Sequence, residues 1–262
     1  MSDIHIEFPN VEPPKITPLS DVLFLAGDIG KPSKPNMVNF LRHMASIFPQ
    51  VYFVAGNHEF YFGEYWTVKK EIEGICADIP NLHFLDRGSV LWINESTGEP
   101  PVRIIGCTLW SHVPESDEPS VSRMLNDYHT IQYRSPMDGS IDVPKRLTVC
   151  DTNAMHQADV QFIEQELAKS REAGESKAIV MTHHAPLSNG VSDPQYENGG
   201  SPIASAFQTP LDHLMGHNLK YWLYGHTHYN GDVTVNGTRV VANQAGYVHE
   251  KMKWNPDTVF EI

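Results

Sequence analysis

Side chains of the types that bind metal ions occur along the sequence in five short clusters. The clusters are Asp3 with His5, Asp28, Asn57 with His58, His183 with His184, and His226 with His228. Each cluster alone has an ordinary explanation, because an aspartate after a glycine is typical of a turn and a histidine after a strand usually satisfies a local hydrogen bond. Five such clusters, four of them directly after an apolar run, are hard to explain by turn chemistry alone.

The donor atoms of these clusters suit divalent metal ions. Three carboxylate or amide groups and four imidazoles, without thiolates, are typical ligands of Mn, Fe, Zn, Co or Ni. A bridging carboxylate can hold two such ions about 3.5–4 Å apart, where they contact the attacking and leaving oxygens of an in-line displacement. Phosphate esters are the natural substrates of such a site, because both ions neutralise phosphoryl oxygens.

Four apolar runs must bring these clusters together. They are Asp21–Gly27, Val51–Ala55, Lys177–Thr182 and Leu219–Tyr224, and each is typical of a buried parallel strand. The carboxyl ends of such strands meet at one edge of an open α/β sheet, where ligands bind. In Gly225–His228, alternation along an extended segment places both imidazoles on one face. At Asn57 the local pattern leaves two interpretations open, a ligand site or a polar turn that caps the next helix.

The remaining pattern predicts one α/β domain over residues 1–262. Helices are predicted at Asn36–Phe48, Glu59–Ile79, Val121–Leu125 and Thr152–Ala173, and further strands at Leu82–Leu85, Val90–Ile93, Val102–Leu109, Asp232–Val235, Thr238–Val241 and Thr258–Ile262. Strand–helix alternation followed by a hairpin at Asn236-Gly237 favours a layered fold. Two polar loops, Ser111–Ile141 and Pro186–Pro210, are expected to shape a pocket beside the strand ends.

Composition excludes several classes of protein. A formal net charge of −13 repels polyanions, so binding of extended nucleic acid is not expected. No apolar run approaches the roughly 18 residues of a membrane helix, and the first residues do not resemble a secretory signal. The three cysteines, Cys76, Cys107 and Cys150, are too few for a disulfide framework and are interpreted as buried thiols. We therefore expect a cytoplasmic protein without membrane partners.

The clusters, taken in order, resemble the motifs of a known family. Asp3-Ile4-His5, Gly27-Asp28, Gly56-Asn57-His58-Glu59, His183-His184-Ala185-Pro186 and Gly225-His226-Thr227-His228 are similar to the five motifs of the calcineurin-like metallophosphoesterases. The resemblance implies a four-layer α/β/β/α sandwich of two mixed sheets and a dinuclear metal centre. It implies that metal 1 is bound by Asp3, His5, Asp28 and His228, and metal 2 by Asp28, Asn57, His183 and His226.

The resemblance also implies roles for the other motif residues. His58 would stand beside the metals without binding them, contact phosphate and assist departure of the leaving group. A metal-bound hydroxide would be the nucleophile, because the ions lower the pKa of water. Asn57 and His184 are further candidates for substrate contact, although His184 could instead support the ligands. Glu59 is expected to support the turn rather than the chemistry.

These observations predict a metal-dependent hydrolase of small phosphoric esters. A phosphodiesterase is favoured and a phosphomonoesterase is the alternative, while the acidic surface weighs against a nuclease that tracks long strands. A non-catalytic metal-binding scaffold of the same fold is disfavoured, because all seven ligand positions and His58 are present. The sequence specifies neither the physiological substrate nor the oligomeric state.

One departure from the family pattern concerns the first strand. Family members usually have a full apolar strand before the first motif, whereas only Met1 and Ser2 precede Asp3 here. We therefore expect a truncated first strand, with Asp3 and His5 on a frayed segment and metal 1 bound more weakly than metal 2.

Overall fold

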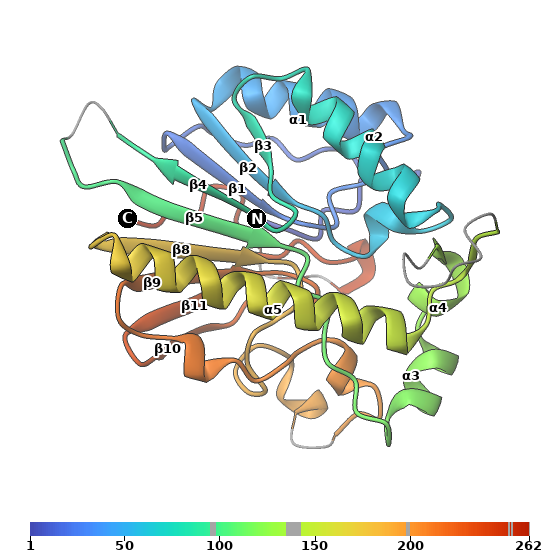
Figure 1. The fold of residues 1–262 in the computed structure, drawn as a ribbon. Coiled ribbons are helices and arrows are strands. Elements are labelled where there is room, and N and C mark those ends of the chain that lie inside the picture. Colours follow the sequence, from blue (N-terminus) through green and yellow to red (C-terminus); the bar gives the residue numbers. More distant parts are fainter. Residues whose placement is uncertain (95–97, 135–142, 198–199, 251, 253, 262) are drawn as a thin grey trace.

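Two β-sheets face each other between layers of helices (Figure 1). The computed structural model describes all residues except 95–97, 135–142, 198–199, 251, 253 and 262. The smaller sheet has the order β1-β2-β3 and parallel pairings, with β1 at Val22–Ala26, β2 at Gln50–Val54 and β3 at Leu82–Phe84. The larger sheet is mixed and has the order β10-β11-β9-β8-β5-β4. Its strands are β4 at Gly88–Trp92, β5 at Val102–Cys107, β8 at Lys177–Thr182, β9 at Leu219–Tyr224, β10 at Asp232–Val235 and β11 at Thr238–Ala242.

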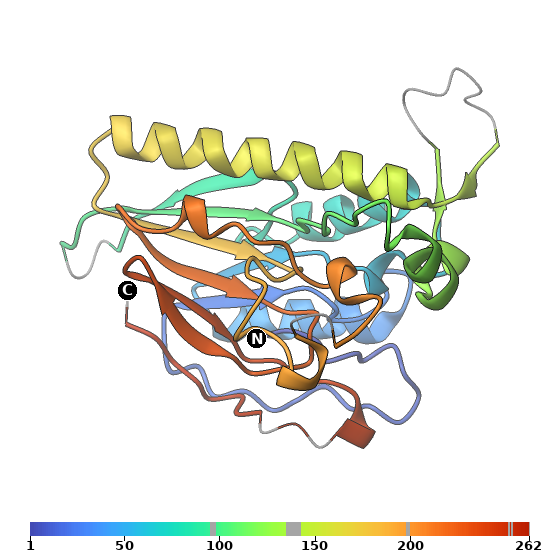
Figure 2. The same cartoon turned by 90° about the horizontal axis from the view of Figure 1, so that it is seen from below.

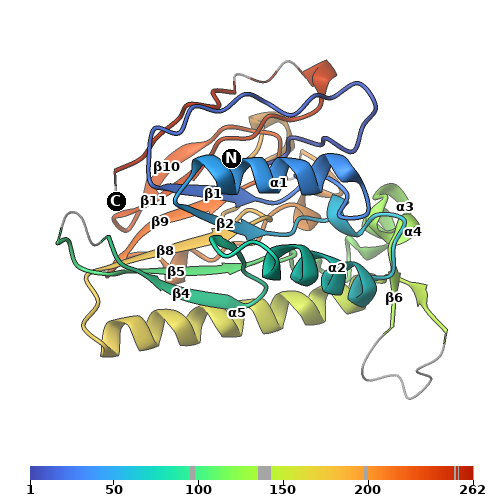
Figure 3. The ribbon, with the colours of Figure 1, turned by 90° about the horizontal axis from the view of Figure 1, so that it is seen from above.

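Helices cover the outer faces of both sheets. α1 (Pro35–Ile47) and α2 (Tyr65–Ala77) lie outside the smaller sheet, as Figure 3 shows from above. α5 (Val149–Glu172) lies along the outer face of the larger sheet (Figure 2). Two short helices, α3 (Glu118–Met124) and α4 (Asp127–Thr130), lie beyond the carboxyl ends of the strands, near a small ribbon of β6 (Gln132–Tyr133) and β7 (Lys145–Arg146) (Figure 1).

The alternation of side chains along the strands builds the four layers. In β1, Leu25 packs with α1 and α2, whereas its neighbour Ala26 packs between the two sheets. In β5, Ile104 packs between the sheets, whereas Ile105 packs with Leu167 of α5. Consecutive residues of one strand therefore belong to different hydrophobic layers. This is the four-layer arrangement that the sequence predicted.

Residues 1–6 lie between the two sheets, at the ends of β1 and β11. On one side, the N–H groups of Asp3 and His5 donate to backbone carbonyls just after β1, at 3.0 Å each. On the other side, Ser2 pairs with the backbone just after β11, at Asn243 and Ala245. Asp3 is 0% exposed and His5 1% exposed. The expectation that these two residues fray is therefore wrong, and with it the reason for expecting a weaker metal 1.

The second helix starts later than predicted. The sequence predicts a helix over Glu59–Ile79, whereas the structure has a single 3-10 turn at His58–Phe60, and α2 begins only at Tyr65. Glu64 is the N-cap, because its carboxylate accepts hydrogen bonds from the backbone N–H groups of the first helical turn. The intervening turn leaves Glu59 free to contact the loops after β1 and β2.

Two other predictions are corrected at the surface. Residues 258–261 form no regular element, so the strand predicted at Thr258–Ile262 is absent over its described part, and Ile262 lies outside it. Cys76 and Cys107 are buried as expected, but Cys150 is exposed. Across the described ranges, no helix has both the length and the apolar character needed to cross a membrane.

Candidate metal centre

The strand ends bring the predicted ligand clusters to one place. Asp28 follows β1, Asn57 follows β2, His183 follows β8 and His226 follows β9. The segments approach so closely that a Cβ atom built on Gly27 would lie 2.5 Å from Nδ1 of His183 and 2.6 Å from the backbone nitrogen of Gly56. The glycine that precedes Asp28 is thus required by the convergence of two loops.

Five of the predicted ligands have a strained backbone. Asp3, His5, Asp28, His226 and His228 all have positive φ angles, between 47° and 69°. This left-handed conformation is uncommon for residues other than glycine. It costs of order 1–3 kcal/mol at each residue and tends to occur at functional sites. The fold therefore holds these side chains in directions that an unstrained turn would not give.

The predicted ligand atoms form two adjoining groups. In the first group, Nε2 of His228 lies 3.2 Å from Nε2 of His5 and 3.4 Å from Oδ1 of Asp3. In the second, Nε2 of His183 lies 3.0 Å from Oδ1 of Asn57 and 3.5 Å from Oδ2 of Asp28.

Asp28 and His226 complete the arrangement. Oδ2 of Asp28 also lies 3.9 Å from Nε2 of His5, so this carboxylate stands between the two groups. His226 belongs to the second group, because its ligand atom lies within 4.8 Å of those of Asp28 and His183. The structure thus brings all seven predicted ligands together.

The outer nitrogen of three of the histidines is held by an acceptor. Nδ1 of His5 contacts Glu7 at 3.1 Å, Nδ1 of His228 contacts Glu250 at 2.6 Å, and Nδ1 of His183 contacts the carbonyl of Ala26 at 2.8 Å. Such partners fix the tautomer and turn Nε2 toward a metal.

The sequence analysis missed two of these acceptors. Glu7 continues the alternation of Asp3 and His5, and this spacing could have identified it. Glu250 comes from the tail, and no local pattern marks it.

The donor set fits divalent cations. Nε2 of His226 is buried and has no hydrogen-bond partner, whereas nearly all buried polar atoms in native structures are paired. Its neighbours in the site are imidazole nitrogens and carboxylate oxygens, the ligands that borderline divalent metals prefer. Without a cation, the buried carboxylates of Asp3 and Asp28 would depend on protonated histidines for compensation.

Glu59 ties together the two loops that carry Asp28 and Asn57. Its carboxylate accepts four backbone N–H groups, from Asp28, Ile29, Gly30 and Gly56, at 2.7–3.2 Å. It is 0% exposed, and burial together with the nearby Asp28 carboxylate raises the pKa of Glu59 to about 7. The supporting role predicted for Glu59 is therefore confirmed by its contacts.

His58 stands beside the centre with both ring nitrogens engaged. Nδ1 contacts Glu7 at 2.9 Å, Nε2 contacts the hydroxyl of Tyr247 at 3.1 Å, and the ring stacks on Tyr61 with centroids 4.2 Å apart. Burial lowers the pKa of His58, but the carboxylates of Asp28 and Glu7 outweigh this and raise it. A protonated His58 is thus favoured here, which suits a proton donor.

Two further predicted site residues have distinct surroundings. Asn57 turns Oδ1 toward His183, while its Nδ2 donates to the hydroxyl of Tyr61 at 3.1 Å. His184 is 2% exposed and stacks behind His226 with centroids 4.0 Å apart. Because His184 does not line the pocket described next, its position favours support of His226 over contact with substrate.

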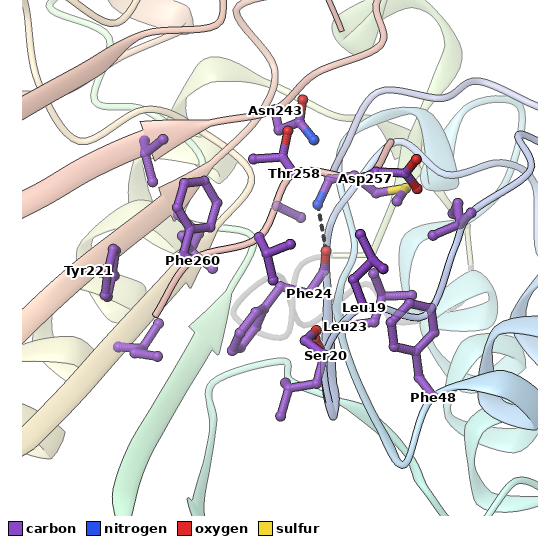
Figure 4. Close-up of a pocket in the computed structure, with 18 of the residues that line it drawn as sticks. Leu19, Ser20, Leu23, Phe24, Phe48, Tyr221, Asn243, Asp257, Thr258 and Phe260 are labelled. Atoms are coloured by element: carbon purple, nitrogen blue, oxygen red, sulfur yellow. Dashed lines mark hydrogen bonds between the residues drawn. The ribbon is translucent and has the colours of Figure 1, made fainter. Parts of the chain in front are cut away.

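A pocket of about 400 Å³ opens above the ligand groups. Asp28, Asn57, His58, His226 and His228 contribute to its lining, and so do side chains from α3, α4 and the segment 192–208. Another hollow, of about 330 Å³, lies between β1 and the tail residues Asp257–Phe260 (Figure 4). Its labelled lining is mainly apolar, and no histidine occurs among its described lining residues. The pocket of about 400 Å³ above the ligand groups is therefore the candidate site.

Comparison with known proteins agrees with this geometry. Residues 1–230 match the family model of the calcineurin-like phosphoesterases. The chain is 31% identical over 258 residues to "Uncharacterized protein L509" of Acanthamoeba polyphaga mimivirus, covering 93% of this chain and 85% of the relative. Its fold is similar to the crystal structure of the phosphopantetheinyl hydrolase of Mycobacterium tuberculosis, with a TM-score of 0.66 and 17% identity, over 95% of this chain and 89% of that one. The chain therefore belongs to the calcineurin-like phosphoesterase family, whose members are metal-dependent hydrolases of phosphoric esters.

Proposed function

We propose that this protein hydrolyses small phosphoric esters with two divalent cations bound at the candidate centre. The proposed ligands are those implied by the sequence, with Asp3, His5, Asp28 and His228 at one ion and Asp28, Asn57, His183 and His226 at the other. The observation that carries the proposal is the orientation of the imidazoles. Three of them have Nδ1 held from outside, and the buried Nε2 of His226 has no partner in the protein.

The cations would neutralise the phosphoryl oxygens and lower the pKa of a water molecule. The protein's own residues would position these groups and move protons. Oδ1 of Asp28 accepts the backbone N–H of His58 at 2.8 Å, so the position of Asp28 is fixed relative to that of His58. Glu7 accepts from Nδ1 of His58, which leaves the Nε2 proton of the imidazolium to face the site.

His58 is the proposed general acid. In hydrolysis, a water oxygen that gives up one proton to solvent forms a bond to phosphorus, the bond from phosphorus to the leaving oxygen breaks, and the Nε2 proton of His58 passes to that oxygen. His58 then takes up a proton from solvent for the next turnover. Tyr247 contacts the same nitrogen at 3.1 Å, so its hydroxyl must give way when substrate binds. General acid catalysis of this kind contributes about 10²–10⁴ in rate.

We further propose that diesters are preferred over monoesters. A diester carries one charge and two organic groups, so it needs less positive charge and more room than a monoester. The pocket of about 400 Å³ provides that room, and its described lining contains no lysine or arginine beside the proposed cations. A phosphomonoesterase remains the alternative and is tested by the same assay.

Replacement of Asp28 tests the proposal. In Asp28→Asn, both ions lose a ligand, so we expect the metal content to fall for both sites and turnover to be lost. The matched control is Asp232→Asn, which makes the same chemical change at a half-exposed surface pair with Arg239. Elemental analysis of both variants, with a panel of mono- and diesters, provides the measurement. Unchanged metal content in Asp28→Asn would contradict the ligand assignment, and bound metal without turnover of any ester would indicate a scaffold.

A further inference from the structure

The pocket above the metal centre has an apolar wall. Met124 and Leu125, at the end of α3, line it together with Ile203, Ala204 and Phe207. The two parts of this wall are joined, because Ser205 donates to Asp117 at the start of α3 at 2.7 Å. Leu125, Ile203 and Phe207 also pack on the same hydrophobic cluster. The wall is thus packed on the core, and it adjoins the metal centre because Phe207 stacks on His226 with ring centroids 4.6 Å apart.

The wall is partly open to solvent. Met124 is 52% exposed, although most large apolar side chains of the described residues are buried. Tyr196, which lines the same pocket, is 51% exposed. An exposed apolar surface next to a reactive centre is typical of a place where a ligand binds.

Away from the proposed cations and the histidines, the charged side chains of the pocket are carboxylates. Asp127 and Glu250 line it, and its described lining contains no lysine or arginine. A second phosphate group outside the metal centre would therefore meet carboxylates rather than a lysine or an arginine. Apolar contact with the wall is the interaction that the pocket offers to the rest of the substrate.

We propose that this wall binds an apolar organic group of the substrate, so that the preferred ligands are phosphodiesters of single negative charge with aryl or alkyl substituents. The inference rests on the proposed function, because the metal centre must bind the phosphoryl group. Met124, Leu125 and Ile203 are its specificity-determining residues. A substrate with a second phosphate is disfavoured by the same wall.

Binding is measured in the His58→Ala background, in which both cations should be retained and turnover is expected to be about 10²–10⁴-fold slower, so the test does not rely on hydrolysis. Dimethyl phosphate and diphenyl phosphate carry the same charge and differ in apolar area. By calorimetry on the metal-loaded protein, we expect diphenyl phosphate to bind at least about 10-fold more tightly. Its binding should also have a more negative heat-capacity change, the mark of apolar burial. Phenylene bisphosphate, which adds a second phosphate to a ring, should gain nothing over phenyl phosphate.

A charge placed on the wall supplies the matched variants. Met124→Lys should lower the affinity for diphenyl phosphate about 5-fold or more. It should raise the affinity for phenylene bisphosphate by a similar factor. Ile93→Lys makes the same change in charge at a 56% exposed apolar residue that does not line the pocket. Ile93→Lys should change the affinity for neither ligand by more than about 2-fold. Inorganic phosphate should bind all three proteins alike, because the metal centre is unaltered.

The outcomes separate the two proposals. If inorganic phosphate and both diesters fail to bind the metal-loaded protein, the proposed function itself is wrong. If phosphate binds but diphenyl phosphate is no tighter than dimethyl phosphate, the inference alone is overturned. Equal effects of Met124→Lys and Ile93→Lys would also overturn it, because they would show that the wall does not contact the organic group.

Discussion

Replacing Glu59 with glutamine tests how the two loops that carry the proposed ligands Asp28 and Asn57 are held together. The carboxylate accepts two N–H groups at each oxygen, from Ile29 and Gly30 at Oε1 and from Asp28 and Gly56 at Oε2. Glutamine keeps one oxygen, but its NH₂ group must face the other pair of donors. Either orientation of the amide therefore leaves two buried N–H groups without an acceptor.

The size of the effect follows from this count. A buried donor left unpaired costs about 1–3 kcal/mol, so two of them should lower the free energy of unfolding by about 2–6 kcal/mol. A single domain is stable by about 5–15 kcal/mol in total. Glu59→Gln should thus be among the most destabilising conservative changes in the protein, although it removes no metal ligand.

Urea denaturation of the metal-free protein at pH 8 measures this loss. At that pH, Glu59 is above its raised pKa of about 7 and is ionised. Glu64→Gln is the control, because Glu64 also accepts backbone N–H groups, from Trp66 and Thr67, but at a helix N-cap whose contact with Thr67 is open to solvent. Water can replace its lost contacts, so we expect a loss of about 1 kcal/mol or less. Equal losses in the two variants would refute the reasoning.

Three further predictions concern the metal centre. His58→Ala should retain both metals by elemental analysis while kcat falls about 10²–10⁴-fold; loss of metal would make His58 a ligand instead. Tyr61→Phe keeps the ring that stacks on His58 but removes the acceptor of Asn57 Nδ2, so calorimetry should show about 10–100-fold weaker binding at that metal alone. Burial lowers the pKa of His183, but carboxylates, chiefly Asp28, outweigh this and raise it to about 9. Burial likewise lowers the pKa of His228, but carboxylates, chiefly Asp3, raise it to about 10. Because these folded-state values exceed the ordinary 6.5, the metal-free protein should be most stable below about pH 6.5 and lose stability as the pH rises through 9 and 10. Metal binding at pH 7 should correspondingly release protons, which calorimetry in two buffers detects; metal binding without proton release would contradict these protonation states.

Two strands that precede proposed ligands were predictable from the sequence. Lys177–Thr182 and Leu219–Tyr224 have the bounds that their apolar patterns predict. A buried strand is recognisable from its own sequence, because both of its faces pack on apolar neighbours and nearly every residue is therefore apolar. For the same reason, the residues directly after these strands could be assigned to one edge of a sheet.

The features that were missed depend on distant partners. Asp3 and His5 are ordered by backbone groups after β1 and β11, and no local pattern near the start of the chain encodes that pairing. Glu250 reaches His228 only because the tail folds back over the site. The strand predicted at Thr258–Ile262 fails for the opposite reason. Its residues have strand-forming types, but the described ones find no neighbouring strand with which to pair.

The long span between the ligands has a consequence for synthesis. Asp3 accepts the backbone N–H of His226, and the N–H of His228 is in turn held by Gln244. A ribosome therefore exposes the first ligands long before it releases the residues that complete their shell. Contacts of such sequence separation form slowly, because the intervening chain must be closed into a loop first. We therefore expect the proposed cations to bind only after residues 226–250 have folded against the start of the chain.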